Sequence, residues 1–375
     1  MAACNARREV DVLILGAGPA GSGLALALKR AGVADVLLVD RPTRRPFCIR
    51  EAAAPSLGPL LRRLGLDDRL DHHGHHLCHG NLSFWGGPAL AVEDFMNRAL
   101  GPGWHLDRAA FDAWLRAKAV GGGAELLSPA CLAAARRDGD GWQVDIQEGG
   151  LRHEARPRWI VDATGRPAAF ARRSGARLHR FDRLVAIAAL AEPVESRGFD
   201  GFSVVEAVEI GWWYAARLPD GREVIALMTD ADLAREADLL SPVAFRQAWA
   251  ATSEISHFAL LPPNQAPRPI AFAAGTQFID RAIAPGWLAL GDALIALDPL
   301  SAAGITGALE DAVAAADAIV RLLGLPGRGE ARDVRCAYAA RADATLKRFS
   351  AQHNAIYGRE RRWRESTFWR RRTTV

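Results

Sequence analysis

A chain of 375 residues, half of them hydrophobic, is too long for one small domain and can bury a large core. No apolar run reaches the ~20 residues of a membrane-spanning helix, and a strand-like run begins so near the N-terminus that a signal peptide has no room. The net charge of +4, with Arg clustered near the C-terminus, and five scattered cysteines without a CxxC pair argue against nucleic acid binding, a disulfide framework and a zinc site, and favour a cytoplasmic protein.

The first predicted unit is a strand over residues 10–15, a glycine turn, a helix over 24–30 and a second strand, within VDVLILGAGPAGSGLALALKRAGVADVLLVD. In the spacing GxGxxG, the first glycine makes the tight turn, the second lets the backbone approach a pyrophosphate, and the third lets the helix pack closely on the strand. The acid that closes the second strand is placed to bond a ribose hydroxyl. This unit therefore predicts a dinucleotide site made by Gly16, Gly18, Pro19, Gly21 and Asp40.

Two later strand-like runs also end in glycine-bearing turns. RWIVDATGRPAAFAR runs into Asp162 and Gly165, and PGWLALGDALIALDPLSAAGITGA runs into Gly291 and Asp292. Because the carboxyl ends of parallel strands meet at the same edge of a sheet, all three turns could converge there. A nicotinamide dinucleotide needs only the first turn, whereas a longer extended ligand would use all three. The sequence therefore predicts FAD.

The order of these three turns resembles that of the class A flavoprotein monooxygenases, over nearly the whole chain. The resemblance implies an α/β fold with a Rossmann-like FAD-binding domain of the p-hydroxybenzoate hydroxylase (GR2) type, an antiparallel β-sheet substrate domain and a C-terminal helical segment. The expected boundaries are 1–75, 104–175 and 275–325 for the FAD-binding domain, 76–103 and 176–274 for the substrate domain, and 326–375 for the C-terminal segment.

The resemblance also implies roles for single residues. In that family the aspartate of the Gly-Asp pair, here Asp292, bonds the ribityl chain, and backbone N–H groups after the flavin-loop proline stabilise charge on the reduced ring. The chemistry needs O2 as co-substrate. Electrons come from NAD(P)H bound transiently or from a separate flavin reductase, because the chain has no second complete GxGxxG unit. The expected ring contacts are Pro299, Gly304 and Ile305, and the expected pyrophosphate contacts are Arg50 and Arg108.

One segment, REAAAPSLGPLLRRLGL, resembles GE-S-x-x-P-x-L-x-x-L-G-L of the flavin-dependent tryptophan halogenase superfamily, and the tail ERRWRESTFWRRR resembles that superfamily's C-terminus. Halogenation there depends on a lysine shortly after this segment, yet no lysine lies between Lys29 and Lys118. Ser301 stands where tryptophan halogenases carry a Glu. Tyr214 and Ala216 stand where they carry the tryptophans of WxWxIP, a signature that separates substrate from flavin. These three departures argue against halogenation.

Without that barrier, the resemblance implies hydroxylation of an electron-rich aromatic substrate through a C4a-hydroperoxyflavin. One subgroup of the superfamily hydroxylates a Trp side chain in a partner polypeptide during tryptophylquinone maturation, and SFWGG, GPGWHLDRAAFD and GWWYAARLPDGREVIALMTDADL resemble it. We therefore expect an aromatic small molecule or a Trp-containing partner protein or peptide as substrate. A flavin-dependent halogenase, a non-catalytic chaperone that delivers FAD and a plain dinucleotide reductase remain open.

The region between the second and third turns predicts the substrate sheet. Its three strand-like runs, RLVAIAALAEP, FSVVEAVEIGWWYAARLP and REVIALMTDADL, with a DG turn before the last, are typical of an antiparallel ribbon. Alternation along a strand puts Trp212 and Tyr214 on one face, where they could stack an aromatic ring or belong to the core. The predicted substrate contacts are Trp85, Trp212 and Tyr214, with Trp104 and Trp213 as further pocket candidates. The catalytic candidates are His79, His105 and Glu206 as general base, and Ser301 in the flavin loop.

Two charged or ligand-rich stretches have competing interpretations. HHGHH, residues 72–76, could bind a metal together with Cys78 and His79, but a solvated loop is the favoured interpretation, so we predict no metal. The Arg-rich tail is expected to pack its Trp and Phe residues on the FAD lobe with the arginines outward; docking of an acidic partner protein is the alternative.

Overall fold

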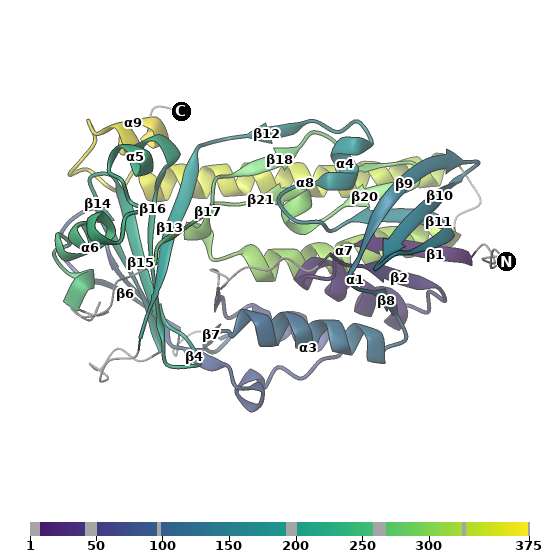
Figure 1. Ribbon diagram of the computed structural model, residues 1–375, viewed down its shortest axis with the longest axis horizontal. Helices are drawn as coiled ribbons and strands as arrows, with labels where there is room; N and C mark the ends of the chain where they lie inside the picture. The colour runs from purple at the N-terminus through teal and green to yellow at the C-terminus, as the bar shows by residue number, and fades with distance from the viewer. Residues whose placement is uncertain are drawn as a thin grey trace.

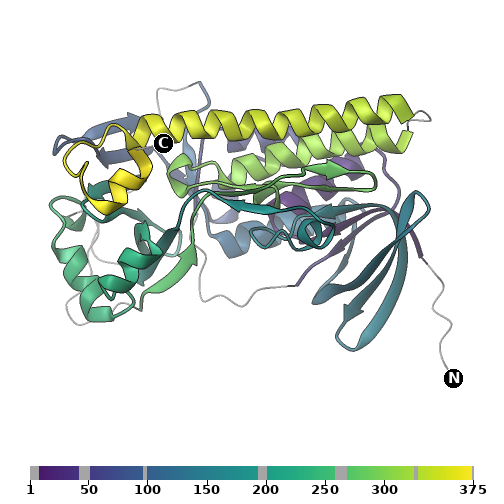
Figure 2. The ribbon, with the colours of Figure 1, turned by 90° about the horizontal axis from the view of Figure 1, so that it is seen from above.

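The computed structural model describes residues 8–41, 51–95, 99–192, 201–257, 268–324 and 328–373. Figure 1 shows two bodies along the longest axis: a parallel sheet with its helices at one end, and a seven-stranded sheet at the other. The helix α8 (Arg328–Tyr357) runs along both bodies, as Figure 2 shows from above. Among the described residues, no helix combines the length and the apolar character that crossing a membrane requires.

The first body is built on an eight-stranded sheet in which β20, β11, β1, β2 and β8 are neighbours in that order and all parallel. Its central strands are buried on both faces, which is why they consist of continuous apolar runs. The remaining three strands pair antiparallel at its margins. The bounds are β1 (Arg8–Leu15), β2 (Val36–Val39), β8 (Glu125–Leu127), β9 (Ala130–Asp138), β10 (Gly141–Glu148), β11 (Leu151–Asp162), β19 (Ile283–Ala284) and β20 (Trp287–Ala289).

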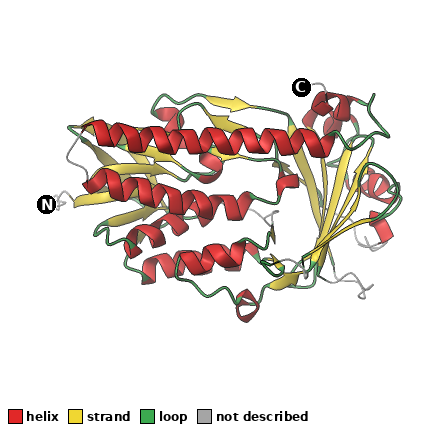
Figure 3. Ribbon diagram, turned by 180° about the vertical axis from the view of Figure 1, so that it is seen from behind, coloured by secondary structure: helices red, strands yellow, loops and turns green. Residues whose placement is uncertain are grey.

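Three long helices pack together beside this sheet, visible from behind in Figure 3. They are α1 (Pro19–Arg30), α3 (Arg108–Gly121) and α7 (Gly304–Gly324). The helix predicted from residue 24 in fact begins at Pro19, because Pro is favoured in the first turn of a helix and Gly18 serves as its N-cap. The prediction of an α/β, Rossmann-like fold with a second sheet and a C-terminal helical segment is confirmed. Two shorter helices are α2 (Leu57–Arg63) and α4 (Ala169–Arg173).

The second body is a seven-stranded sheet with the order β17-β13-β16-β15-β14-β5-β6. Its neighbours pair antiparallel, except that β14 and β5 are parallel. The bounds are β5 (Gly80–Phe84), β6 (Ala91–Asp94), β13 (Leu184–Ala191), β14 (Phe202–Val208), β15 (Gly211–Arg217), β16 (Glu223–Asp230) and β17 (Ile270–Ala273); the helices α5 (Ala231–Glu236) and α6 (Pro242–Ala250) belong to the same region. Two three-stranded sheets complete the fold: β12 (Leu178–Arg180), β18 (Gln277–Ile279) and β21 (Ile295–Ala296), and β3 (Ala52–Ala53), β7 (Gly103–His105) and β4 (His76–Cys78).

The run FSVVEAVEIGWWYAARLP, predicted as one strand, is a hairpin of β14 and β15. The chain reverses between Val208 and Gly211, which face each other in register. Gly211 has a φ of +155°, and a Cβ there would lie 2.0 Å from the carbonyl oxygen of Met228 in β16. The reversal therefore depends on a close backbone approach that hydrophobic periodicity does not reveal.

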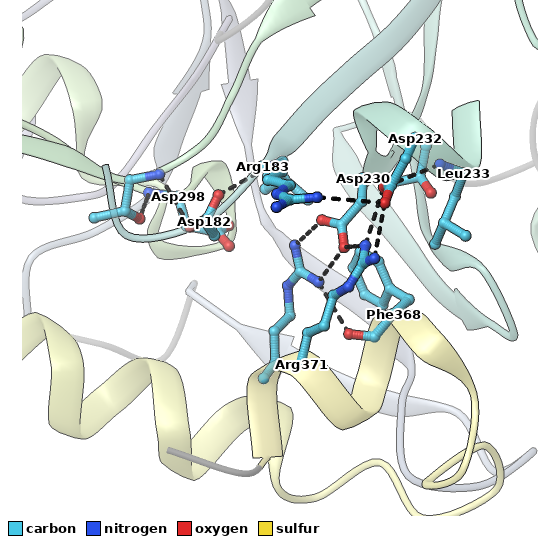
Figure 4. A network of polar contacts seen from close by, with 12 residues as sticks. Asp182, Arg183, Asp230, Asp232, Leu233, Asp298, Phe368 and Arg371 are labelled. Carbon is cyan, nitrogen blue, oxygen red and sulfur yellow. Dashed lines mark hydrogen bonds and ion pairs between the residues drawn. The ribbon is translucent and has the colours of Figure 1, made fainter. Parts of the chain in front are cut away.

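The C-terminal helix α9 (Thr367–Thr373) corrects the prediction for the tail. Phe368 and Trp369 are fully buried, but they pack on the seven-stranded sheet and not on the FAD lobe. The arginines are not all outward either, because the guanidinium of Arg372 is buried 2.6 Å from the Asp230 carboxylate of β16. Figure 4 shows Arg371 reaching from α9 to Asp230 and Asp232. Docking of an acidic partner protein on the remaining arginines stays a prediction.

Candidate active site

The three glycine turns lie side by side at the carboxyl edge of the parallel sheet, as the sequence predicts. The N–H of Ala163, after β11, donates to the carbonyl of Leu15 at the end of β1, over 2.9 Å. The N–H of Leu290, after β20, donates to the carbonyl of Asp162 over 3.1 Å. The chain thus brings the three turns together through backbone hydrogen bonds between neighbouring strands.

The glycines of the first turn have different tasks. Gly16 has a φ of +106°, and a Cβ there would meet the Ala163 carbonyl oxygen at 2.3 Å; a Cβ at Gly21 would meet the Gly16 carbonyl oxygen at 1.9 Å. A Cβ at Gly18 would meet no atom within 4 Å. The first and third glycines are therefore needed by the fold itself, whereas the second borders open space at the N-terminus of α1, where a pyrophosphate fits.

Asp40 lies beside this turn, and its carboxylate accepts the N–H of Ala17 at 3.0 Å. Its other oxygen lies 3.4 Å from the guanidinium of Arg116 in α3. Arg116 was not a candidate from the sequence, because it comes 76 residues later and no motif contains it. Asp40 therefore lies at the carboxyl edge of the parallel sheet, beside the first glycine turn. Its hydrogen bond to a ribose hydroxyl stays a prediction.

The Gly-Asp turn is held by a partly buried ion pair that the sequence did not reveal. Gly291, with a φ of +58°, donates its N–H to Asp311 of α7 at 3.0 Å, and Asp311 pairs with Arg341 of α8 at 2.5 Å. Burial raises the pKa of the Asp311 carboxyl, and Arg341 opposes this shift. Two helices therefore fix the backbone that positions Asp292, which borders the cavity described below.

The other predicted cofactor contacts have mixed surroundings. The buried Asp162 carboxylate accepts the N–H groups of Thr164 and Ala171, at 3.0 and 2.7 Å, so it shapes its own turn. Gly165, with a φ of +72°, completes that turn. Arg108 begins α3, where its guanidinium lies 3.2 Å from Asp112; its contact with the pyrophosphate stays a prediction. Arg50 lies outside the described residues.

A cavity of ≈ 350 Å³ lies between the two bodies and is lined by residues of both. Its first wall consists of the flavin loop, residues 297–302, together with Asp292 and the first residues of α7, Gly304 and Ile305. The N-terminus of a helix carries a partial positive charge and unpaired N–H groups, which suit a flavin ring that becomes negative on reduction. Pro299 and Ser301 belong to the same wall, so the predicted ring contacts are brought together.

The opposite wall is one face of the seven-stranded sheet. Side chains alternate between the faces of a strand, so every second residue of neighbouring strands lines the cavity. These residues are Asn81, Ser83, Ala91, Glu93, Ser203, Val205, Trp212, Tyr214, Val224, Ala226 and Met228. The prediction that Trp212 and Tyr214 share a face is confirmed by this lining.

The remaining tryptophan candidates divide between this wall and the cores. Trp85 borders the cavity, and its indole N–H donates to the carbonyl of Ile356 at 2.9 Å. Trp213 points to the other face of the sheet, where it packs against Phe245 and Trp249. Trp104 belongs to the core of the first body. Substrate contacts by Trp85, Trp212 and Tyr214 stay predictions, while Trp213 and Trp104 are core residues.

A buried polar chain joins the two walls. Trp212 donates its indole N–H to the Tyr357 hydroxyl at 2.9 Å, and that hydroxyl donates to Asp298 in the flavin loop at 2.8 Å. Asp298 also accepts the N–H of Leu300 at 2.8 Å. Tyr357, the last residue of α8, therefore holds the sheet at a set distance from the flavin loop.

The four catalytic candidates are not brought together. Ser301 lines the cavity, and its Oγ donates to the Asp298 carbonyl at 2.9 Å. His105 is buried with Nε2 2.9 Å from Oγ of Ser203, a residue of the cavity lining, and His79 packs near Phe202. Glu206 is a correction, because its carboxylate accepts the N–H groups of residues 253–255 on the far face of the sheet, and so supports that loop instead of facing the cavity.

Comparison with known proteins identifies the family. The sequence profile of the FAD binding domain family matches residues 9–345. The chain belongs to this family. LodB of Marinomonas mediterranea, which is classed as an FAD-dependent oxidoreductase, is 28% identical over 369 residues, covering 96% of each chain. A brominase of 1H-pyrrole-2-carbonyl groups on a peptidyl-carrier protein, from Pseudoalteromonas luteoviolacea, is 25% identical over 83% of this chain and 77% of its own.

Among solved structures, the peptidyl tryptophan dihydroxylase QhpG, essential for tryptophylquinone cofactor biogenesis, has a TM-score of 0.79 and 26% identity, covering 97% of this chain and 78% of its own. The predicted resemblance to halogenase-like flavoproteins, including those of tryptophylquinone maturation, is thereby confirmed. The residues of this FAD-binding protein fit the cofactor, since an open glycine, three adjacent turns and a helix N-terminus lie along one path.

The histidines of the HHGHH segment are divided between a short helix, the strand β4 and the residues that join them. His72 and His73 end a 3-10 helix, η1 (Leu70–His73), and the buried His75 accepts the N–H of Asp107 through Nδ1 at 3.2 Å. Across the part of the chain that the structure describes, no three His, Cys, Asp or Glu residues are grouped so as to hold a metal ion.

The lowered pKa of buried His105 should make the stability of this FAD-binding protein depend on pH. Burial, and secondarily the charges of His76 and His79, lower the pKa of His105 from 6.5 to about 4. Between pH 4 and pH 6.5 the unfolded chain therefore binds more protons than the folded chain. The free energy of unfolding is highest above pH 6.5 and decreases as the pH is lowered toward 4. The expected loss is about 3 kcal/mol. Urea unfolding at several pH values should show it, and His105→Gln should show a flatter curve; equal curves would contradict the assignment.

Proposed function

We propose that this FAD-binding protein is a monooxygenase that hydroxylates an electron-rich aromatic substrate, a tryptophan side chain within a partner polypeptide. The relatives LodB and QhpG support an oxidoreductase, and the name of QhpG mentions a peptidyl tryptophan substrate. The observation that carries the proposal is the cavity itself. Its flavin-loop wall faces a sheet wall that offers aromatic and aliphatic side chains to a flat ring.

The placement of the lysines supports hydroxylation over halogenation. The chain has only Lys29, Lys118 and Lys347, and all three are in described helices, α1, α3 and α8. None lines the cavity, so the lysine on which the related halogenases depend has no counterpart there. Ala216 follows Tyr214 on the same strand face and faces Val224 across the sheet. Alanine at that position lacks the bulk of the tryptophan that stands there in the WxWxIP signature of the related halogenases.

The residues of the chain have separable tasks in this reaction. Bound reduced FAD, together with O2, would supply one oxygen atom to the aromatic ring. The N-terminus of α7 would face the ring of the cofactor, while Trp212 and Tyr214 would hold the substrate against it. The hydrogen bonds of Tyr357 with Trp212 and Asp298 hold these two walls in a fixed relative position. Electrons would come from NAD(P)H or from a separate flavin reductase.

The proposal is tested by isotope labelling of two probes, a synthetic peptide with one tryptophan and free indole. The FAD-loaded protein is reduced and mixed with each probe under oxygen-18 gas, with and without bromide. We expect heavy oxygen in the tryptophan of the peptide, in amounts that bromide does not change. Brominated product would favour the halogenase, and unlabelled probes with no oxygen consumption would favour an FAD-delivering chaperone. Labelling of indole alone would point to a small-molecule substrate.

A further inference from the structure

A buried carboxylate that the proposed function does not use lies at the junction of the two walls. Glu51 is 1% exposed and lines the cavity. Its carbonyl accepts the N–H of Leu106 at 2.8 Å, and the following strand β3 contacts α7. Backbone pairing therefore fixes this residue beside the helix end that faces the flavin site.

Protonatable side chains surround Glu51 on the sheet side. The Tyr214 hydroxyl lies beside the Glu51 carboxylate and Ser203, and burial, followed by the negative charge of Glu51, raises the pKa of Tyr214 well above its usual value. Ser203 Oγ is 2.9 Å from Nε2 of His105. His105 pairs in register with His76, which is exposed, so the two side chains lie on the same face of the small sheet. These groups lead from the cavity to the surface.

The other carboxylates near the cavity have different tasks. Asp298 accepts hydrogen bonds from Tyr357 and Leu300, and Glu93 lies on the exposed strand β6, where it accepts from Asn81 at 2.9 Å. Asp292 stands on the flavin-loop wall. Glu51 is therefore the buried carboxylate on the substrate side of this described lining. A carboxylate in such a place can accept a hydrogen bond, and then a proton, from a bound aromatic N–H.

We propose that Glu51 is the catalytic base of this cavity and acts on the indole N–H of the substrate; the inference rests on the proposed function. As the new C–O bond forms, Glu51 takes the N–H proton and the N–H electron pair moves into the ring. The nitrogen regains a proton when the substituted carbon loses its hydrogen, so one C–H becomes one C–OH. One atom of O2 enters the product and the other leaves as water, with two electrons supplied by a nicotinamide cofactor or a reductase. Ser203 and His105 are positioning residues that lead the proton toward His76.

The first test compares binding of indole and 1-methylindole, which lacks the N–H, to the FAD-loaded protein. The change in flavin absorbance gives both dissociation constants for the wild type, Glu51→Gln and Glu236→Gln, a matched change at an exposed residue of α5. The ratio of the dissociation constant of 1-methylindole to that of indole measures the preference for indole. This ratio should be about tenfold larger in the wild type and Glu236→Gln than in Glu51→Gln, because Glu51→Gln loses a buried hydrogen bond to a charged group. Equal preferences in all three proteins, or no binding of indole to the wild type, would overturn the proposal.

The second test measures the rate of labelled product from the same proteins. With the tryptophan peptide as substrate, Glu51→Gln should slow labelling about 100-fold while retaining FAD, in the range typical of a lost general base. Unchanged product formation by Glu51→Gln overturns the role of Glu51 and leaves hydroxylation standing. Absence of product from the wild type removes the proposed function and the base together. Weaker FAD binding with an unchanged indole preference would make Glu51 a cofactor contact and would also overturn the proposal.

Discussion

Replacing Gly18 with alanine should leave the protein folded but weaken FAD binding about 10- to 100-fold. The structure shows no atom within 4 Å of a Cβ at this position, and its extended backbone, with a φ of −73°, accepts any side chain. The added methyl group would occupy the space in which the pyrophosphate approaches the backbone. Titration of the apoprotein with FAD, followed by flavin fluorescence, measures the loss, and thermal unfolding of the apoprotein shows whether the fold is retained.

Gly21→Ala is the matched change that should act on the fold. Its Cβ would lie 1.9 Å from the Gly16 carbonyl oxygen, a backbone atom that cannot move without displacing the turn. We expect this variant to unfold at a lower temperature even without FAD, because its free energy of unfolding should decrease by several kcal/mol. If Gly18→Ala bound FAD as tightly as the wild type, the cofactor path assigned to this turn would be wrong.

Replacing Arg372 with alanine should lower the free energy of unfolding by about 3 kcal/mol, the lower end of the range for breaking a buried ion pair. The Asp230 carboxylate would stay buried without the guanidinium that lies 2.6 Å away. Arg371, 2.8 Å from the other oxygen, would compensate in part. The change also removes the guanidinium from its place 3.7 Å above the Phe368 ring, which contributes to the same loss.

Urea unfolding of the Arg372 variant checks this value, with the exposed Arg364→Ala as the control. The control should change the free energy of unfolding by less than about 0.5 kcal/mol. The double variant Arg372→Met, Asp230→Leu should recover much of the loss, because an apolar pair leaves no buried charge. An effect of Arg372→Ala no larger than that of the control would show that α9 does not anchor the seven-stranded sheet.

Features specified by neighbouring residues could be predicted from the sequence. The spacing of Gly16, Gly18 and Gly21 between two apolar runs predicts the turn, since the whole pattern lies within one strand–helix unit, even though the closest neighbour of Gly16 is Ala163 of the next turn. The alternation that puts Trp212 and Tyr214 on one face is likewise a property of a single strand. The convergence of the three turns followed from the rule for parallel strands, and the hydrogen bonds from Ala163 and Leu290 bear it out.

Features that depend on distant contacts were missed or misplaced. The ion pair of Asp311 with Arg341 supports the Gly-Asp turn from two helices, and no local pattern distinguishes it from a surface pair. The tail was placed on the wrong body because an amphipathic segment shows which side is apolar but not which apolar surface it will meet. Glu51 lies within a segment that resembles the family motif, yet its position in the cavity depends on pairing with residues 104–106.

We propose that one cavity holds a flavin ring on the wall formed by the flavin loop and α7, and an aromatic substrate on the sheet wall. A crystal structure of the FAD-loaded protein with indole tests it most directly. We expect the flavin ring beside Pro299 and Ile305, with indole between that ring and Trp212 and its N–H directed to Glu51. A protein that does not bind FAD, a flavin ring outside this cavity, or indole bound elsewhere would contradict this arrangement.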